Sequence, residues 1–192
     1  MTYDIPGSGV VSNIDDATKT IDLLFESGTD LSIALKPEFT LSKYATLREG
    51  TSSKPHRSGV TSLVFADTVV YKVTAEDGTT ISYYNVMVDL MPGIVGASLT
   101  ELVPSPLAAF DHQSFGVSFC VHPQTDVNSM LLSLDTYPGN ATVKIVEEKG
   151  ATVNKVFENN ITRVDLSAPV KFEITDAKNR KTIYAVSVSQ CN

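Results

Sequence analysis

Tryptophan is absent from this chain, and no stretch approaches the roughly 20 consecutive apolar residues that a membrane-spanning helix requires. The N-terminus also lacks the charged segment followed by an apolar segment that is typical of an export signal. We therefore expect residues 1–9, which include Pro6, Gly7 and Gly9, to form a flexible leader. Such a leader fits either a native start or the point at which an export signal has been removed, and we favour the second.

Basic charge is also scarce. The chain carries 22 acidic and 15 basic residues, which gives a net charge of −7 at pH 7. The segments before and after Pro92 are both acidic, so neither offers the concentrated basic face that phosphate groups need. The composition therefore argues against nucleic acid as a partner.

Candidate catalytic groups are few. Nucleophilic catalysis needs a base beside a serine or cysteine, and the chain has three histidines, His56, His112 and His122. No Gly-x-Ser-x-Gly motif accompanies them, and we expect all three to lie in solvent-exposed loops. His112 and His122 flank one predicted strand, about 30 Å apart, too far to share a zinc ion. The acidic pairs 15–16 and 76–77 lack the spacing of a calcium loop. We therefore predict a non-enzymatic protein without a metal or cofactor.

Cys120 and Cys191 are the only cysteines. A disulfide between them would fit an oxidising compartment, but it requires Cα atoms within about 7 Å of each other. Cys120 lies in the apolar segment 115–121, whereas Cys191 is the penultimate residue, and a chain end need not approach that strand. The sequence therefore favours a buried thiol and a separate terminal thiol, with the disulfide as the alternative.

An internal repeat organises the chain. Three pairs of segments share an offset of 96 residues: 21–25 with 117–121, 29–32 with 125–128, and 45–47 with 141–143. Later in each copy the offset grows to about 100, as loop insertions would cause, and relates residues 71–75 to 172–176 and 84–88 to 184–188. A shared offset across separate segments predicts two copies of one domain.

Both copies show the pattern of β-strands. Apolar residues alternate with other residues in segments 21–25 and 117–121, which is the period of a strand with one buried face. Each copy ends in a predicted hairpin, whose turn contains Gly78 in the first copy and Asn179 in the second. We predict an all-β protein of two tandem immunoglobulin-like β-sandwich domains, over residues 10–91 and 92–192.

The first hairpin also resembles a known family. Residues 70–80 are similar to the closing hairpin of immunoglobulin-like domains in surface lipoproteins of Bacteroidetes. Residues 28–32, 35–37 and 41–42 resemble the middle of the same domains. The resemblance covers most of residues 10–90 and is weaker in residues 97–190, where the turn differs and a proline is missing.

The resemblance implies an exported protein on the bacterial cell surface, held at the outer membrane by a lipid anchor that this chain does not contain. Relatives of this kind often serve glycan capture, where such domains act as spacers beside a separate carbohydrate-binding domain. We therefore expect a non-catalytic binding or spacer module whose partner is a glycan. The alternative is an adhesion or assembly module that recognises another surface protein, for example through an unpaired sheet edge.

Tyrosines are the candidate ligand-binding residues, because sugars stack on exposed aromatic faces and tryptophan is absent. We expect Tyr44, Tyr83 and Tyr137 to be exposed, and these three are the candidate binding residues. The other interior tyrosines of the predicted strands alternate with core residues and are expected to pack inside: Tyr71, Tyr84 and Tyr184.

Overall fold

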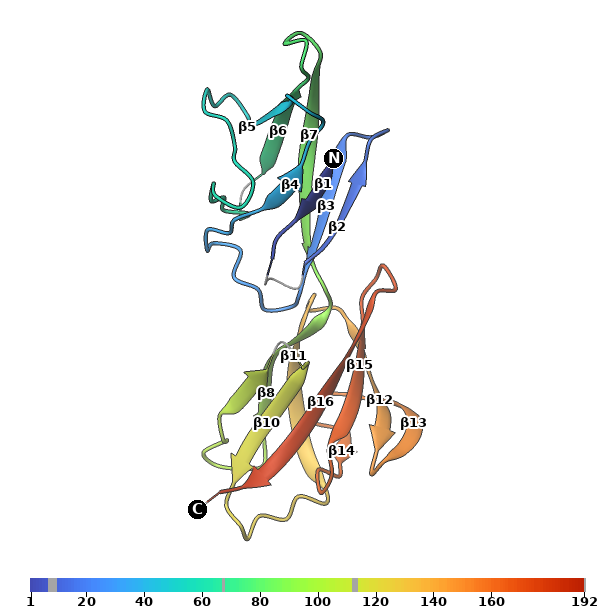
Figure 1. Ribbon diagram of the computed structural model, residues 1–192. Helices are drawn as coiled ribbons and strands as arrows, with labels where there is room; N and C mark the ends of the chain where they lie inside the picture. The colour runs from blue at the N-terminus through green and yellow to red at the C-terminus, as the bar shows by residue number, and fades with distance from the viewer. Residues whose placement is uncertain (7–9, 67, 112–113, 192) are drawn as a thin grey trace. The chain divides into compact units, whose positions relative to one another are not determined.

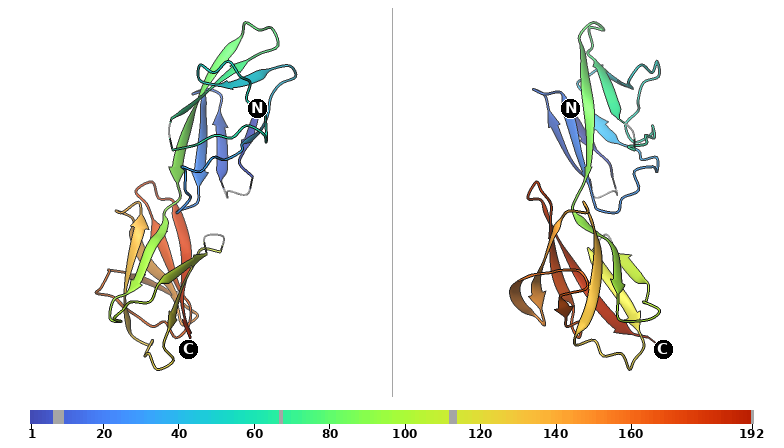
Figure 2. Two further views of the ribbon diagram at one scale, coloured as in Figure 1. Left: turned by 90° about the vertical axis from the view of Figure 1, so that its left-hand side faces the viewer. Right: turned by 180° about the vertical axis from the view of Figure 1, so that it is seen from behind.

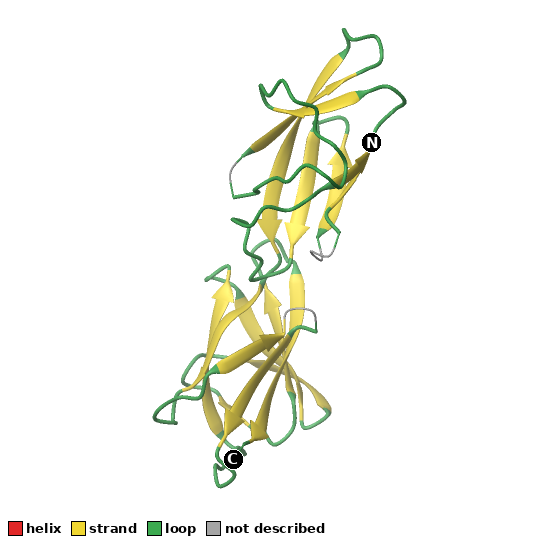
Figure 3. Ribbon diagram, turned by 60° about the vertical axis from the view of Figure 1, so that its left-hand side comes forward, coloured by secondary structure: helices red, strands yellow, loops and turns green. Residues whose placement is uncertain are grey.

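The computed structural model describes residues 1–6, 10–66, 68–111 and 114–191. The chain divides into two compact units, Met1–Leu90 (the first unit) and Met91–Asn192 (the second unit). Every regular element in the described ranges is a β-strand (Figure 1; Figure 3). Within those ranges, no helix is long and apolar enough to cross a membrane. The chain is all-β and forms two tandem immunoglobulin-like sandwiches, as the strand pattern predicts.

The first unit contains a five-stranded sheet in the order β2-β3-β7-β6-β5 and a two-stranded sheet of β1 and β4 (the strands are labelled in Figure 1, and Figure 2 gives two further views). An isolated bridge between Leu35 and Leu63 extends the smaller sheet's side of the sandwich. Its strands are β1 (Thr2–Asp4), β2 (Val11–Asp15), β3 (Thr20–Phe25), β4 (Glu38–Thr40), β5 (Thr46–Glu49), β6 (Val69–Thr74) and β7 (Ile81–Leu90).

The second unit repeats this plan with one additional strand in each sheet. Its large sheet has the order β9-β10-β16-β15-β12-β13, and its smaller sheet has the order β14-β11-β8. Its strands are β8 (Gly93–Leu99), β9 (Ala108–Asp111), β10 (Gly116–Val121), β11 (Met130–Tyr137), β12 (Thr142–Glu148), β13 (Ala151–Val156), β14 (Arg163–Val164), β15 (Val170–Thr175) and β16 (Lys181–Gln190).

The repeat holds at the level of strand register. In the first unit β3 runs parallel to β7 and places Ile21 opposite Val86. In the second unit β10 runs parallel to β16 and places Val117 opposite Val186. These are the pairs that the offsets of 96 and 100 residues relate, so two segments far apart in each copy meet in the same register.

The segment that crosses from one sheet to the other, here called the crossing segment, is repeated as well, at residues 56–61 in the first unit and 157–162 in the second. His56 donates its backbone N–H to the carbonyl of Leu47 at 2.7 Å, and Phe157 donates in the same way to Val143 at 3.1 Å. The turns that follow, residues 57–61 and 158–162, share the same backbone hydrogen bonds and a threonine hydroxyl that accepts from the first residue of the turn. His56 and Phe157 therefore occupy equivalent positions.

Each unit has its own hydrophobic core between its two sheets. Tyr71, Tyr84 and Tyr184 are buried in these cores, which confirms the prediction for them. The first core also includes Tyr3 and Ile5, which are 4% and 2% exposed. The flexible leader predicted over residues 1–9 is therefore wrong for residues 2–5, because alternating side chains of β1 cover one face of the core. Residues 7–9 lie outside the described part of the chain.

The two hairpins have the predicted turn conformations. Gly78 has φ of +69°, and Asn179 reaches the same left-handed region at +59°. Asp77 accepts the backbone N–H groups of Thr79 and Thr80, and these bonds, together with one from the Thr80 hydroxyl, lower the pKa of Asp77 to about 2. The Asp77 carboxylate therefore stabilises a turn.

Cys120 and Cys191 form a disulfide, and their Cα atoms are 5.6 Å apart. The favoured expectation of two separate thiols is therefore wrong. The parallel pairing of β10 with β16 continues to Val121 and Gln190, and the backbone N–H of Cys191 donates to the carbonyl of Val121 at 2.9 Å. Cys191 is thus held beside β10 by this hydrogen bond and by the disulfide.

Candidate functional site

Tyr44 lies in the turn between β4 and β5, and Tyr137 is the last residue before the equivalent turn of the second unit. The turn between β4 and β5 closes through a hydrogen bond from Ala45 N–H to the Ser42 carbonyl at 3.1 Å. The turn between β11 and β12 closes through the equivalent bond from Ala141 to Pro138 at 2.9 Å. Tyr44 is 65% exposed within its turn, and Tyr137 is 36% exposed immediately before its turn.

Tyr83 lies on the outer face of the five-stranded sheet. It is 55% exposed, and its neighbour Tyr84 points into the core. Lys72 on β6 is its register partner, and Arg48 on β5 is the register partner of Lys72. An aromatic ring and two cationic side chains thus stand in one row across three adjacent strands.

The predicted exposure of the three candidate tyrosines is confirmed. Tyr44 and Tyr83 belong to the first unit, one on a turn and one on a sheet face, whereas Tyr137 belongs to the second unit. Whether they bind a ligand stays a prediction.

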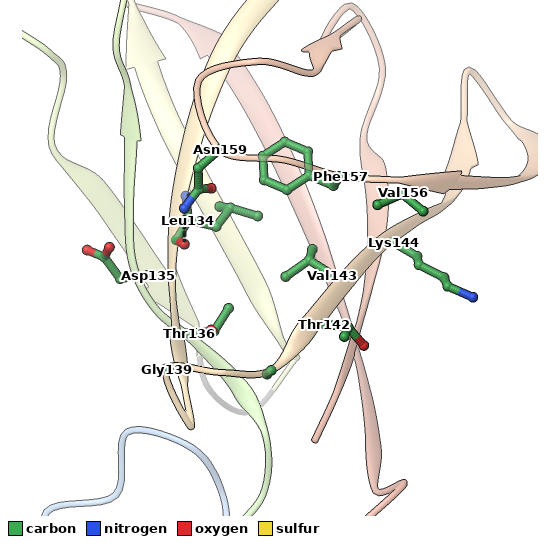
Figure 4. A pocket seen from close by; sticks show the side chains of 11 residues that line it. Leu134, Asp135, Thr136, Gly139, Thr142, Val143, Lys144, Val156, Phe157 and Asn159 are labelled. Atoms are coloured by element: carbon green, nitrogen blue, oxygen red, sulfur yellow. Dashed lines mark hydrogen bonds between the residues drawn. The ribbon is translucent and has the colours of Figure 1, made fainter. Parts of the chain in front are cut away.

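A pocket of about 540 Å³ opens in the second unit between β11 and β12 (Figure 4). Leu134, Val143 and Phe157 point toward one another and form its apolar floor. Its lining consists of residues from β11, β12, the end of β13 and the turns between them: Leu134, Asp135, Thr136, Gly139, Ala141, Thr142, Val143, Lys144, Val156, Phe157 and Asn159.

Polar groups surround that floor. The side-chain amide of Asn159 accepts the backbone N–H of Leu134 at 2.8 Å and donates to its carbonyl at 3.0 Å, which ties the crossing segment to β11. Val156 is 63% exposed at the margin. An apolar floor with polar groups around it is the usual character of a small-ligand site. Tyr137 does not line the pocket, although Thr136 and Gly139 on either side of it do.

No local sequence pattern marks this pocket. Its residues come from strands of both sheets and from the crossing segment, so only the tertiary pairing brings them together. The candidate binding residues predicted from the sequence are aromatic, whereas the pocket is lined mainly by aliphatic and small polar side chains.

His56 is buried, with 7% of its surface exposed, so the expectation of an exposed loop histidine is wrong for it. Its ring packs 5.4 Å from the ring of Tyr71, centroid to centroid. Neither ring nitrogen has a hydrogen-bond partner of normal geometry in the described part of the chain. Burial lowers the pKa of His56, while the backbone of Thr61 and the carboxylate of Glu49 oppose that shift.

The remaining histidines differ from His56. His122 is exposed, as predicted, whereas His112 lies outside the described residues. Among the residues that the structure does describe, there is no cluster of three or more histidine, cysteine, aspartate or glutamate side chains arranged to hold a metal ion. The carboxylate of Asp15, in the first acidic pair, accepts the backbone N–H groups of Ala17 and Thr18, which lowers its pKa.

Comparison with known families gives one match. Residues 1–88 match the family described as "SGBP, N-terminal", which covers nearly all of the first unit. The resemblance to Bacteroidetes glycan-capture surface proteins is thereby confirmed. No curated protein is significantly similar to the chain.

Two solved structures from Bacteroides align with the chain. A protein of Bacteroides fragilis proposed to be secreted is 19% identical over 46% of this chain and 88% of its own length, with a TM-score of 0.34. A proposed glycoside hydrolase of Bacteroides thetaiotaomicron is 21% identical over 95% of this chain, with a TM-score of 0.38. The present chain spans 43% of that second protein. Because both TM-scores lie below 0.5, the fold assignment rests on the strand order and register described above.

Proposed function

We propose that this chain, whose residues 1–88 match the family "SGBP, N-terminal", is a non-catalytic binding or spacer module of a Bacteroidetes glycan-capture system. The family match is the observation that carries the proposal. The second unit repeats the strand order of the first, so it is suited to the same kind of role.

The mechanism is the positioning of surfaces. Each sandwich is a rigid frame whose turns and outer sheet faces carry exposed side chains, among them Tyr44, Tyr83 and Tyr137. An exposed tyrosine offers a flat apolar face to sugar C–H groups and a hydroxyl for hydrogen bonding. In the proposed setting the protein is exported and tethered by lipid to the outer membrane, where it contacts glycans weakly.

A glycan-array screen of the purified chain tests this proposal, with Tyr44→Ala, Tyr83→Ala and Tyr137→Ala screened in parallel. Ile161→Ala is the matched control, since Ile161 is a similarly exposed residue, at 70%. We expect saturable binding that one of the tyrosine variants abolishes and the control retains. If no glycan on a broad array binds, direct glycan recognition is excluded, and a spacer role or protein recognition is left.

Protein recognition is the second candidate, and the edge strand β13 favours it. This strand is one of the two edge strands of the six-stranded sheet, and most of its side chains are exposed. An open edge can accept a strand from another protein. Within the described strand pair, Asn154 has no register partner on β12, so Asn154→Pro should spare the sheet and block strand addition. Protein recognition would be supported if no glycan on the array bound and if this variant no longer bound an outer-membrane protein that the unchanged chain binds.

A further inference from the structure

The row formed by Tyr83, Lys72 and Arg48, here called the Tyr83 row, crosses the outer face of the first unit's large sheet. Strand alternation fixes its orientation, because one strand neighbour of each row residue is buried, namely Tyr84, Tyr71 and Leu47. Adjacent strands are about 4.8 Å apart, so the three side chains form one compact group.

The neighbouring outer-face positions carry no charge. On one side of the Tyr83 row the register places Ile81, Thr74 and Thr46, and on the other side it places Asn85 and Val70. Neither Lys72 nor Arg48 forms an ion pair within the part of the chain that the structure describes. Two cationic groups thus stand beside an exposed aromatic ring without acidic partners, on a protein of net charge −7.

The equivalent row of the second unit is different. Its residues are Ile183, Glu173 and Lys144, paired in the same register. Glu173 forms an ion pair with Lys181 at 3.0 Å, and in the next row Lys171 forms one with Glu147 at 2.8 Å. The aromatic ring is absent there and most of the charges are compensated within the sheet, so the second unit serves as an internal reference for the first.

Aromatic faces stack on the C–H surfaces of sugars, and arginine and lysine bind carboxylates through charge-assisted hydrogen bonds. We propose that the Tyr83 row binds a glycan chain that carries uronic acid carboxylates. This inference rests on the proposed role in glycan capture and names the class of glycan.

Carboxylate-bearing glycans fit better than the other anionic partners. A densely sulfated chain is repelled by a protein of net charge −7 that offers it only two cationic side chains. Lysine is depleted at protein–protein interfaces, whereas Lys72 is the central residue of the Tyr83 row.

The test is binding of the full chain to polygalacturonic acid, measured by affinity electrophoresis at low and at moderate salt. Dextran is the neutral comparison, dextran sulfate the sulfated one, and polyglutamate the carboxylate polymer without sugar. We expect retardation by polygalacturonic acid alone, weakened by salt because the contacts are exposed. Lys72→Glu, which installs the residue of the second unit, should weaken binding about tenfold or more.

Two further variants separate the contributions of the tyrosine ring and of the arginine cation to glycan binding. Tyr83→Ile, which likewise installs the residue of the second unit, should weaken binding through loss of stacking, and Arg48→Gln should weaken it through loss of one cation. Ile183→Ala in the second unit is the matched control and should leave binding unchanged. Thermal unfolding of each variant shows that the fold is retained.

The outcomes distinguish this inference from the proposed function. Binding of polygalacturonic acid that survives Lys72→Glu and Tyr83→Ile would overturn the inference. Equal binding of dextran sulfate or polyglutamate would overturn the assignment to uronic acids. Binding of neutral glycans alone would overturn the inference and leave the proposed function standing, whereas failure of every glycan would overturn the inference and the glycan-binding part of the proposed function.

Discussion

The two units share strand order, register and crossing segment, yet they differ in the chemistry of equivalent positions. The first unit places His56 against Tyr71, and the second places Phe157 against Phe172. The Tyr71 hydroxyl is paired with the hydroxyl of Tyr3 at 2.8 Å. Backbone architecture in this protein is therefore set by strand pattern and turns, and the polarity of the core can change without altering it.

A second difference concerns how each unit is held together. The second unit is closed by a disulfide that joins residues 71 positions apart, whereas the first unit contains no cysteine. The first unit instead buries a histidine, His56, whose ring nitrogens lack partners of normal geometry in the described part of the chain, and such a buried polar group costs stability. We therefore expect the two units to respond differently to reduction, to pH and to core substitution.

Removal of the disulfide has the largest expected effect. Replacing Cys120 and Cys191 with serine should destabilise the second unit by about 4 kcal/mol, because a long loop is released in the unfolded chain. Calorimetry should show a lower transition temperature for the second unit and an unchanged one for the first. A shift of both transitions would contradict the independence of the two units.

The exchange of His56 and Phe157, the equivalent residues of the two units, has the second largest expected effect on stability. Phe157→His should cost the second unit about 3 kcal/mol, since it removes apolar contacts and buries a polar ring. The reciprocal His56→Phe should stabilise the first unit by about 1 kcal/mol. Urea unfolding curves measure both changes. Destabilisation by His56→Phe would mean that the imidazole makes contacts that phenylalanine cannot replace.

Loss of the hydrogen bond between the hydroxyls of Tyr3 and Tyr71 has a smaller expected effect on stability. Tyr3→Phe leaves the Tyr71 hydroxyl buried without its partner and should cost about 2 kcal/mol. The double variant Tyr3→Phe/Tyr71→Phe removes both hydroxyls and should lie closer to the wild type. A double-mutant cycle by chemical denaturation checks this, and strict additivity would refute a direct hydroxyl interaction.

Acid should destabilise the first unit selectively. Burial lowers the pKa of His56 below its ordinary value of 6.5, so below that pH the unfolded chain binds a proton that the folded unit resists. Stability is then lost as pH falls, by up to about 1.4 kcal/mol per pH unit. His56→Phe should abolish this histidine-dependent loss. Unfolding curves measured between pH 7 and 5 would contradict the prediction if the variant kept the same slope.

Substitutions in the hairpin turns have the smallest expected effects on stability. Gly78→Ala places a side chain at φ of +69° and should cost the first unit about 1 kcal/mol. Asn179→Gly should change the second unit by less, roughly 0.5 kcal/mol or below, because asparagine already tolerates that conformation. Thermal unfolding of each variant measures the difference, and equal effects at the two turns would contradict it.

The local sequence pattern was sufficient to predict the strands, the hairpins and the repeat. Alternation predicts which face of a strand is buried, and the turn residues predict where the chain reverses, so both hairpins could be located from the sequence. The buried positions of Tyr3 and His56 could not, because β1 is only three residues long and the crossing segment has no period. Both are buried through long-range pairing.

The same limit applies to the cysteines and to the surfaces. Cys191 lies near Cys120 because β10 and β16 pair in parallel, a register that no local signal specifies. Tyr83 could be predicted as exposed, but its neighbours Lys72 and Arg48 could be recognised only after the pairing of three strands was known.

The most direct test of glycan binding at the Tyr83 row is a two-dimensional ¹H–¹⁵N titration of the full chain with oligogalacturonate. We predict saturable shifts at Tyr83, Lys72, Arg48 and their neighbours on β5, β6 and β7, with the equivalent row of β16, β15 and β12 unaffected. Shifts confined to the pocket between β11 and β12, or no shifts at all, would contradict this prediction.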